Sequence, residues 1–554
     1  MMEPFERIDI QELPLSVPSI RRKVEDFLGG NGLRLEEVDL YLAVLDGEGD
    51  ILAGGGLRRD LIKCIAVSEK ARSAGLSVPL MSRLISVAAE RGHTNVKVFT
   101  KPENRSVFES MGFHVLAEAP KAILMENGRG LADYCAYLRV HQASGVIVMN
   151  ANPFTLGHRY LVEQAALSSR ASEGRRNLTV IPVKEDISRF SYAERLAMIR
   201  TGCGDRADVV EGSDYQISAA TFPTYFLKDL SEVSETQMRL DIDLFGRHIA
   251  PALGASVRFV GSEPADPLTA RYNALMQELL PKYGVEVVEV PRLTDAQGPV
   301  TATRVRALLD EGRFTAAKEL TPASTWPYLM ADLAERALRM ELDAPLKPGL
   351  VGPDSAGAHS DMNYALMRRS IAAIRPYFSR MALSGSADEL RQLGIDAEKA
   401  MLEATGGVNC HRGAIFALGL ALYPFPANET AALLDDGSSK QRDARIKGAM
   451  QLAREGYKIL FDNWLPYFRS VKADAYRLQR TLLRIISELD DTCIIHRVGY
   501  ERAQEVKAEA KALLKRFDVQ GLKDLCDRYA REGASPGGAA DMLALTVFID
   551  SLLS

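Results

Sequence analysis

The sequence of 554 residues has only six cysteines, and no two of them form a closely spaced pair. Closely spaced cysteines are typical of structural zinc sites and of disulfide frameworks in small secreted domains. Their absence predicts reduced thiols in a cytoplasmic protein. The cysteines are Cys64, Cys135, Cys203, Cys410, Cys493 and Cys526.

Long apolar runs are missing as well. The longest, Ala414 to Pro424, is too short to span the hydrocarbon core of a bilayer. The N-terminus, MMEPFERIDIQELP, carries acidic residues early and lacks the apolar centre of a signal peptide. We therefore expect no membrane partner and a cytoplasmic location.

A surplus of positive charge is also absent, because the net charge is -5. This balance argues against nucleic acid as the principal partner, although local basic pockets for phosphates remain compatible with it. The composition, 47% hydrophobic and 25% charged, is that of a globular protein. A chain of this length exceeds one hydrophobic core, so several domains are expected.

Three regions of different texture divide the chain. Residues 1–130 mix expected strands with helices, and residues 143–325 alternate short β-branched runs with helices, which is typical of a parallel α/β sheet. Residues 327–554 lose the β-branched runs and are expected to be all-α, after a polar linker at 319–325. The expected strands are 38–45, 51–56, 61–67, 95–100, 145–150, 178–183, 257–260 and 285–290, and the main expected helices are 78–89, 365–377, 443–460, 475–489 and 500–517.

The segment Asn152-Pro-Phe-Thr-Leu-Gly-His158 lies between an expected strand and an expected helix. Gly157 and His158 then lie at a helix N-terminus, where free N–H groups and the helix dipole favour phosphate. Gly157 permits close approach of a nucleotide, and His158 can donate a hydrogen bond to an α-phosphate. The alternative is a tight turn with a capping threonine. The strand–loop–helix setting favours the phosphate site.

A second segment, Thr301-Ala-Thr-Arg304, opens another expected helix, whose apolar positions have helical spacing. Thr303 is expected to cap this helix, and Arg304 can meet phosphate oxygens. The alternative is a plain helix cap followed by solvated arginines. The position after a strand of the same α/β region favours the phosphate role.

These two segments together resemble the nucleotidyltransferase superfamily. The stretches MNANPFTLGHRYLVEQA, Val183–Phe190 and Val260–Thr269 resemble citrate lyase ligase more closely, over residues 1 to about 320. That family activates acetate with ATP and acetylates the thiol of citrate lyase's acyl carrier protein. The resemblance implies a Rossmann-like fold for residues 143–325, with ATP, magnesium, acetate and the acyl carrier subunit of citrate lyase as ligands or partners.

The resemblance also implies roles for individual residues. Thr155 and His158 would bind and polarise the α-phosphate, with Asn152 and Gly157 in the same nucleotide site. Thr303 and Arg304 would hold the β and γ phosphates. Charged residues after the second strand are candidates for the acetate or phosphate pocket, or are surface charges: Lys184, Asp186 and Arg195.

The N-terminal region carries a second resemblance. Residues 62–67, then Arg72-Ser-Ala-Gly-Leu-Ser77 and a helix, resemble the acetyl-coenzyme A motif of GNAT acyltransferases, in which a turn offers N–H groups to a pyrophosphate. The final glycine of that motif is Ser77 here. A GNAT-like α/β domain at 1–130 is therefore expected, either to dock the pantetheine-like arm that receives acetyl or to serve a structural role.

In the C-terminal region, polar clusters interrupt apolar helices at 347–351, 357–362, 405–413, 490–497 and 535–541. Glycines beside histidine and aspartate at helix starts favour a phosphate and metal site over a set of helix caps. These segments resemble triphosphoribosyl-dephospho-coenzyme A synthase over residues 330–554. That family transfers the triphosphoribosyl part of ATP to dephospho-coenzyme A and releases adenine. The resemblance implies catalytic roles for His359 and His411, magnesium on Asp490 and Asp491, and a site lined by Lys347, Asp361, Asn409, Arg497 and Asp541 as well.

Several motif positions depart from that family. Gly352 stands where it has aspartate, Cys410-His411 replaces a Thr-His pair, and Cys493 replaces an asparagine. The segment 448–453 lacks an expected arginine and glutamate. The helical region is therefore either a second catalytic domain or a docking module for the carrier. A nucleotidyltransferase acting on another acid or on a pantetheine-type alcohol is the alternative for the α/β region.

Overall fold

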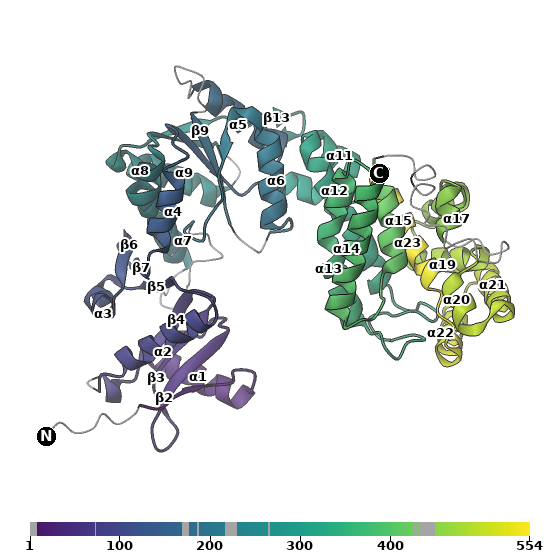
Figure 1. The fold of residues 1–554 in the computed structure, drawn as a ribbon, viewed down its shortest axis with the longest axis horizontal. Helices are drawn as coiled ribbons and strands as arrows, with labels where there is room; N and C mark the ends of the chain where they lie inside the picture. Colours follow the sequence, from purple (N-terminus) through teal and green to yellow (C-terminus); the bar gives the residue numbers. More distant parts are fainter. Residues whose placement is uncertain are drawn as a thin grey trace. The chain divides into compact units, whose positions relative to one another are not determined.

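The computed structural model describes residues 8–72, 74–168, 177–184, 188–216, 230–263, 266–424, 430 and 449–554 (Figure 1). The chain divides into two compact units, Met1–Val300 and Thr301–Ser554. The first is mixed α/β and the second is helical, as the distribution of β-branched residues predicts. Among the described residues, no helix combines the length and apolarity needed to cross a bilayer.

The first unit begins with a seven-stranded sheet of order β1-β2-β3-β4-β5-β7-β6. Neighbouring strands are antiparallel apart from β4 and β5, which are parallel and pair only at Leu61–Lys97 and Ile62–Val98. The elements expected between residues 38 and 112 are confirmed, whereas β1, α1 and β7 were not expected. The bounds are β1 (Ile10–Glu12), α1 (Pro18–Gly30), β2 (Leu40–Leu45), β3 (Ile51–Arg58), β4 (Leu61–Val67), α2 (Ser77–Glu90), β5 (Val96–Thr100), α3 (Arg105–Ser110), β6 (His114–Ala119) and β7 (Ala122–Asn127).

A second sheet of the same unit has the order β10-β9-β8-β11-β12, and all its strands are parallel. The chain order reverses between β8 and β11, which is where a doubly wound sheet opens its ligand crevice. The four predicted strands are confirmed, and β10 is additional. The bounds are α4 (Gly130–Leu138), β8 (Gly145–Met149), α5 (Leu156–Ser168), β9 (Leu178–Pro182), α6 (Tyr192–Cys203), β10 (Asp208–Val209), α7 (Leu230–Leu244), α8 (Ala250–Leu253), β11 (Val257–Gly261), α9 (Pro267–Leu279) and β12 (Glu286–Val290), followed by the short pair β13 (Thr294–Asp295) and β14 (Gly298–Pro299).

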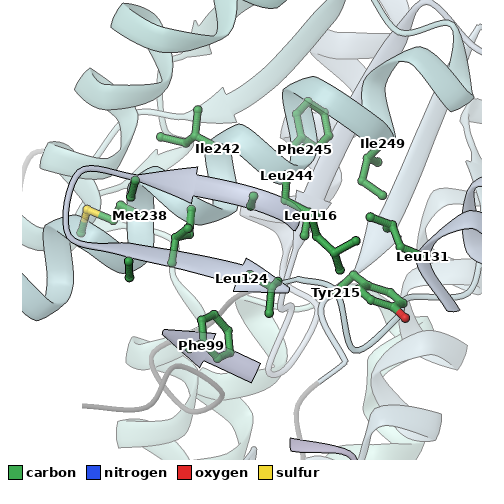
Figure 2. Packing of buried hydrophobic residues seen from close by; sticks show 14 of the residues in the cluster. Phe99, Leu116, Leu124, Leu131, Tyr215, Met238, Ile242, Leu244, Phe245 and Ile249 are labelled. Carbon is green, nitrogen blue, oxygen red and sulfur yellow. The ribbon is translucent and has the colours of Figure 1, made fainter. Parts of the chain in front are cut away.

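The two sheets of the first unit share one hydrophobic core. Figure 2 shows Leu116 of β6 close to Leu244 of α7, and both belong to one buried cluster that also contains Leu124 of β7 and Met238 and Ile242 of α7. A polar contact adds to this packing, because the Glu118 N–H donates to the carboxylate of Asp243, near the end of α7, at 2.8 Å. The N-terminal sheet is thus fastened to the parallel sheet by burial of apolar surface.

The second unit is built from helices, of which α12, α13, α15 and α23 pack against one another (Figure 1). Of the expected helix 443–460, the described part is interrupted at Gly456, whose positive φ of 65° ends a right-handed helix. The bounds are α10 (Ala302–Asp310), α11 (Phe314–Glu319), α12 (Trp326–Asp343), α13 (Tyr364–Leu383), α14 (Ala387–Thr405), α15 (Arg412–Leu422), α17 (Ala449–Arg454), α18 (Leu465–Ser470), α19 (Arg477–Glu488), α20 (Thr492–Val498), α21 (Tyr500–Lys515), α22 (Val519–Glu532) and α23 (Gly537–Leu552).

Candidate functional site

The loop between β8 and α5 holds the His158 imidazole in one tautomer. The Thr155 main-chain N–H donates to His158 Nδ1 at 3.0 Å, and the Thr155 Oγ1 lies 2.8 Å from the same nitrogen. Because a main-chain N–H can only donate, Nδ1 is an acceptor, and the proton of the neutral ring is on Nε2. Burial, reinforced by the positive charge of Arg292, lowers the pKa of His158 to about 4. The ring is therefore a neutral hydrogen-bond donor at pH 7.

Arg292 follows the carboxyl end of β12, and sequence reasoning missed it. Its Nε donates to the Ser262 carbonyl at 2.6 Å, and its guanidinium pairs with Glu263, both of which follow β11. This places a cation beside His158 at the carboxyl edge of the parallel sheet, where ligands of such folds bind. An arginine directly after a predicted strand of a parallel sheet is the signal that identifies such a residue.

Gly157 is the second residue of α5, at its N-terminus as predicted. A Cβ atom at this position would lie 2.4 Å from the Val300 carbonyl oxygen, so the close packing of the chain itself requires glycine here. Asn152 accepts a hydrogen bond from the Phe190 N–H at 3.2 Å, which ties the loop after β8 to the segment after β9. These contacts define the shape of the loop around His158.

In the second unit, Thr301 caps α10, and the prediction that Thr303 caps it is wrong. The Thr301 Oγ1 accepts from the Arg304 N–H at 3.1 Å, because the helix begins at Ala302, two residues earlier than a cap at Thr303 requires. The Thr303 hydroxyl is instead within 3.1 Å of the Arg306 guanidinium. The phosphate roles of Thr303 and Arg304 stay predictions.

Arg195 is fully buried and its guanidinium is used by the protein itself. Its Nη1 donates to the carbonyl oxygens of Asn150 and Val183 at 3.0 and 2.8 Å, and its Nε donates to that of Phe190 at 3.2 Å. It thereby joins the ends of β8 and β9. Lys184 is half-exposed and lies 3.7 Å from Asp214. Asp186 lies outside the described residues.

A cavity of about 430 Å³ opens in the N-terminal sheet where β4 and β5 are no longer paired. Residues from the carboxyl ends of both strands line it, together with the start of α2. Arg72 and Ser77 of the predicted coenzyme A motif are among them, whereas Ser73 lies outside the described residues. Parallel strands that separate expose main-chain N–H and C=O groups to whatever occupies the gap.

The helical unit contains a larger cavity of about 950 Å³. The N-terminal ends of α15 and α23 border it, and such ends favour anions. Arg412 and Arg497 add formal positive charge to its lining. The structure brings six of the predicted site residues together around this cavity: His359, Asp361, Asn409, His411, Arg497 and Asp541.

Both ring nitrogens of His359 are engaged. Arg497 Nη2 lies 3.0 Å from Nδ1, and because guanidinium only donates, Nδ1 accepts and Nε2–H donates to Ser535 Oγ at 2.8 Å. Burial, with the charge of Arg497, lowers the pKa of His359. His359 therefore ties the loop before α13 to the end of α20 and to the segment just before α23.

His411 differs from His359, because its Nε2 is buried and has no hydrogen-bond partner in the described part of the chain. Its Nδ1 lies 2.6 Å from the Ser370 Oγ. Burial, with the positive charge of Lys347, lowers the pKa of His411 to about 4, so the ring is neutral at pH 7. A buried nitrogen without a partner is costly, and at a cavity wall it is suited to a ligand.

Buried carboxylates surround the same cavity. Lys347 is buried and donates at 2.6 Å to Glu341, which lines the cavity. Burial, together with the charges of Asp491 and Glu341, raises the pKa of Asp541 well above its usual range, although the Ala414 N–H opposes this. A Cβ at Gly413 would collide with the Asp541 carboxylate, which explains the glycine.

The predicted magnesium ligands are engaged by the protein. Asp490 pairs with Lys507 at 2.7 Å. Asp491 caps α20, and its two oxygens accept main-chain N–H groups of Cys493, Ile494 and Ala539. In the described ranges, no group of three or more His, Cys, Asp or Glu side chains is arranged to hold a metal ion. Magnesium binding by Asp490 and Asp491 stays a prediction.

The α/β part of the chain is similar to known ligases. Residues 144–329 match the family described as citrate lyase ligase C-terminal domain. The citrate (pro-3S)-lyase ligase of Klebsiella pneumoniae is 41% identical over 328 residues, which cover 57% of this chain and 94% of that protein. The same ligase of Haemophilus influenzae is 38% identical and covers 59% and 98%.

The helical part is similar to a different enzyme. Residues 327–441 and 427–554 match the family described as ATP:dephospho-CoA triphosphoribosyl transferase. A probable 2-(5''-triphosphoribosyl)-3'-dephosphocoenzyme-A synthase of Stutzerimonas stutzeri is 37% identical over 264 residues, which cover 40% of this chain and 91% of that protein. These matches and those of the ligases cover successive parts of one chain. The chain therefore belongs to the citrate lyase ligase family through its N-terminal part and to the triphosphoribosyl-dephospho-coenzyme A synthase family through its C-terminal part, and it is an enzyme that joins a ligase to a synthase.

Proposed function

We propose that the α/β unit activates acetate with ATP and passes the acetyl group to the thiol of the citrate lyase acyl carrier subunit. The observation that carries this proposal is the Thr155–His158 contact, which holds a neutral N–H donor at a helix N-terminus beside Arg292. Such donors stabilise negative charge that builds up on a phosphate in the transition state.

The chemistry has two steps. An acetate oxygen attacks the α-phosphorus of ATP, which is used as its magnesium complex, and pyrophosphate leaves with the electron pair of the broken P–O bond. The carrier thiol then loses its proton and attacks the acetyl carbonyl carbon, and AMP leaves. His158 Nε2–H would donate to the α-phosphate in both steps. Asn152 and Gly157 shape its loop, and Thr303 and Arg304 are proposed to hold the β and γ phosphates.

Acetate-dependent exchange of labelled pyrophosphate into ATP tests the first step. His158→Asn keeps an acceptor near the position of Nδ1 but removes Nε2–H, and we expect a loss of about 10²–10³-fold. His93→Asn, on the turn after α2 in the other sheet of the unit, is the matched control and should leave the exchange unchanged. Wild-type exchange with another carboxylate but not with acetate would favour the alternative of a different acid substrate.

We further propose that the N-terminal sheet is GNAT-like and that its cavity docks the pantetheine-like arm of the carrier. Support comes from the gap between β4 and β5, where the arm's amide groups can pair with main-chain groups of the strands. Val67→Trp, which fills part of the cavity, should slow acetylation of the carrier thiol and leave pyrophosphate exchange intact. Equal rates of acetylation for both proteins would indicate a purely structural domain.

For the helical unit we propose synthesis of 2'-(5''-triphosphoribosyl)-3'-dephospho-coenzyme A. A hydroxyl oxygen of dephospho-coenzyme A would attack C1' of the ATP ribose, and adenine would leave. The size of the cavity, its two helix N-termini and its arginines suit a triphosphate next to a second nucleotide. The proposed lining residues are His359, Asp361, Asn409, His411, Arg497 and Asp541, and Lys347 would act through its ion pair with Glu341. Magnesium binding by Asp490 and Asp491 stays a prediction without a derived step.

Adenine release from ATP in the presence of dephospho-coenzyme A tests this second activity. The alternative, which the altered motif positions suggest, is that the helical unit is a non-catalytic module that docks the carrier. If adenine release depends on dephospho-coenzyme A, docking of the carrier is not the only role of the helical unit. Binding of the carrier without any release of adenine would support it.

A further inference from the structure

We propose that His411 is the base that removes the proton from the attacking hydroxyl group in the helical cavity, and that Ser370 is a positioning residue that holds the His411 ring with its lone pair on Nε2. This inference rests on the proposed synthase function. It assigns a separate role to each of the two histidines that line the cavity and are in the predicted site.

The two histidines are distinguished by their partners. His359 has a protein partner on each ring nitrogen, so neither nitrogen is open to a substrate without breaking a hydrogen bond. His411 has a partner on Nδ1 and none, within the described residues, on Nε2. The residue is 4% exposed, which means that its orientation is determined by packing. Its ring is the one prepared to accept a proton.

The proposed role requires the His411 tautomer that carries its proton on Nδ1. Ser370 Oγ, which can accept as well as donate, lies 2.6 Å from His411 Nδ1. In this tautomer the Ser370 oxygen accepts from Nδ1–H. The lone pair of the ring is then on Nε2.

Ser370 itself is fully buried on α13. The His411 main-chain N–H donates to the Met401 sulfur of α14 at 3.1 Å, which fixes the main chain at the start of α15. One contact to the ring and one to the main chain therefore hold His411 in place.

The hydroxyl oxygen forms a bond to C1' of the ATP ribose, and the C1'–N9 bond breaks with its electron pair passing to adenine. The hydroxyl proton moves to His411 Nε2 and then to the departing adenine, so the ring ends neutral. A bound triphosphate is strongly negative, and its charge raises the proton affinity of a nearby imidazole above that in the empty cavity.

The first test is His411→Asn, measured as adenine release at saturating ATP and dephospho-coenzyme A. Asparagine can keep an N–H near the Nδ1 position for Ser370 but has no nitrogen at the position of Nε2. We expect kcat to fall by about 10²–10⁴-fold, the usual contribution of a general base, with KM for both substrates nearly unchanged. In His411→Gly, added imidazole should restore part of the rate. Wild-type kcat in His411→Asn overturns the proposal.

The second test separates positioning from folding. Ser370→Ala should lower kcat about tenfold at constant KM, and Ser370→Thr, which keeps the hydroxyl, should recover most of it. Ser379→Ala is the matched control, because Ser379 is also buried on α13 and bonds only a main-chain carbonyl among its described contacts. Equal kcat values for Ser370→Ala and Ser379→Ala refute the role of Ser370.

Acetate-dependent exchange in the same chain shows that each variant is folded in its first unit. If wild-type protein releases no adenine, the proposed synthase function fails. If wild-type protein releases adenine and His411→Asn does so equally well, only the assignment of the base fails. Should His411→Asn not fold, the Ser370 and Ser379 pair decides between the two outcomes.

Discussion

Replacing Arg195 by methionine should destabilise the first unit by about 3–6 kcal/mol, because three main-chain carbonyl groups lose a donor. These carbonyls belong to Asn150, Val183 and Phe190, and they accept from the guanidinium at 3.0, 2.8 and 3.2 Å. A buried carbonyl without a partner costs about 1–2 kcal/mol, and methionine fills similar space without an N–H group.

The same substitution should reduce acetate-dependent pyrophosphate exchange. Asn150 directly follows β8, and Val183 directly follows β9. Without Arg195, the two loops at the carboxyl edge of the sheet therefore lose the side chain that binds both of them. Lysine has three donors on one nitrogen, and Arg195→Lys should therefore recover part of the lost stability. Arg200→Met in the same helix is the control, because Arg200 is half-exposed in its pair with Glu211 and should contribute less than about 1 kcal/mol.

The two tryptophans make the measurement selective. Trp326 and Trp464 both belong to the second unit, so their fluorescence follows its unfolding, whereas far-ultraviolet circular dichroism follows both units. In urea, Arg195→Met should shift the dichroism transition to lower concentration and leave the fluorescence transition in place. Unchanged dichroism with lost exchange would refute the structural role and return Arg195 to the substrate pocket that the sequence suggested.

Three further predictions concern single residues. Gly157→Ala should lower pyrophosphate exchange about 10²-fold, because its methyl group would lie 2.4 Å from the Val300 carbonyl and displace the loop; equal exchange would show that the loop yields freely. Gly413→Ala should lower adenine release at least about tenfold, because it displaces the Asp541 carboxylate, and unchanged release would exclude that carboxylate from the site. The pKa of His411 is lowered from 6.5 to about 4, so the unfolded state binds the proton first, and about 3 kcal/mol of stability present above pH 6.5 is lost as the pH falls towards 4. Tryptophan fluorescence in urea should show this loss in wild type but not in His411→Asn, and parallel pH profiles would contradict it.

Local pattern was sufficient for the strands and for the loop that carries His158. The strands β8, β9, β11 and β12 agree with the β-branched runs to within a residue or two at each end, since strands buried on both faces require such runs. The helix that carries His158 near its start was predicted from the helical spacing of its apolar residues. Arg292 was missed because its significance depends on which strand ends lie next to each other.

Contacts over long sequence separations decided the rest. In the sequence, Arg195 and Lys184 are equal candidates for the acetate or phosphate pocket, because both are basic residues after β9. Only the structure shows that the Arg195 guanidinium donates to three main-chain carbonyl groups. Asp490 and Asp491 have the composition of a metal site, yet a lysine of α21 and the main chain of α23 engage them. A carboxylate's availability depends on neighbours that a motif does not contain.

The sequence by itself indicated the two enzyme families of this chain: its motifs place a loop that resembles that of citrate lyase ligase at Asn152–His158 and polar helix starts in the last 200 or so residues. It also determined an α/β part followed by a helical part, because hydrophobic periodicity is local. Only the tertiary structure decided that the first two sheets share a core and that, among the described residues, His359 has a partner on both ring nitrogens while the buried Nε2 of His411 has none. Which groups are buried and already paired is a property of packing, and packing decides which side chain is left to meet a substrate.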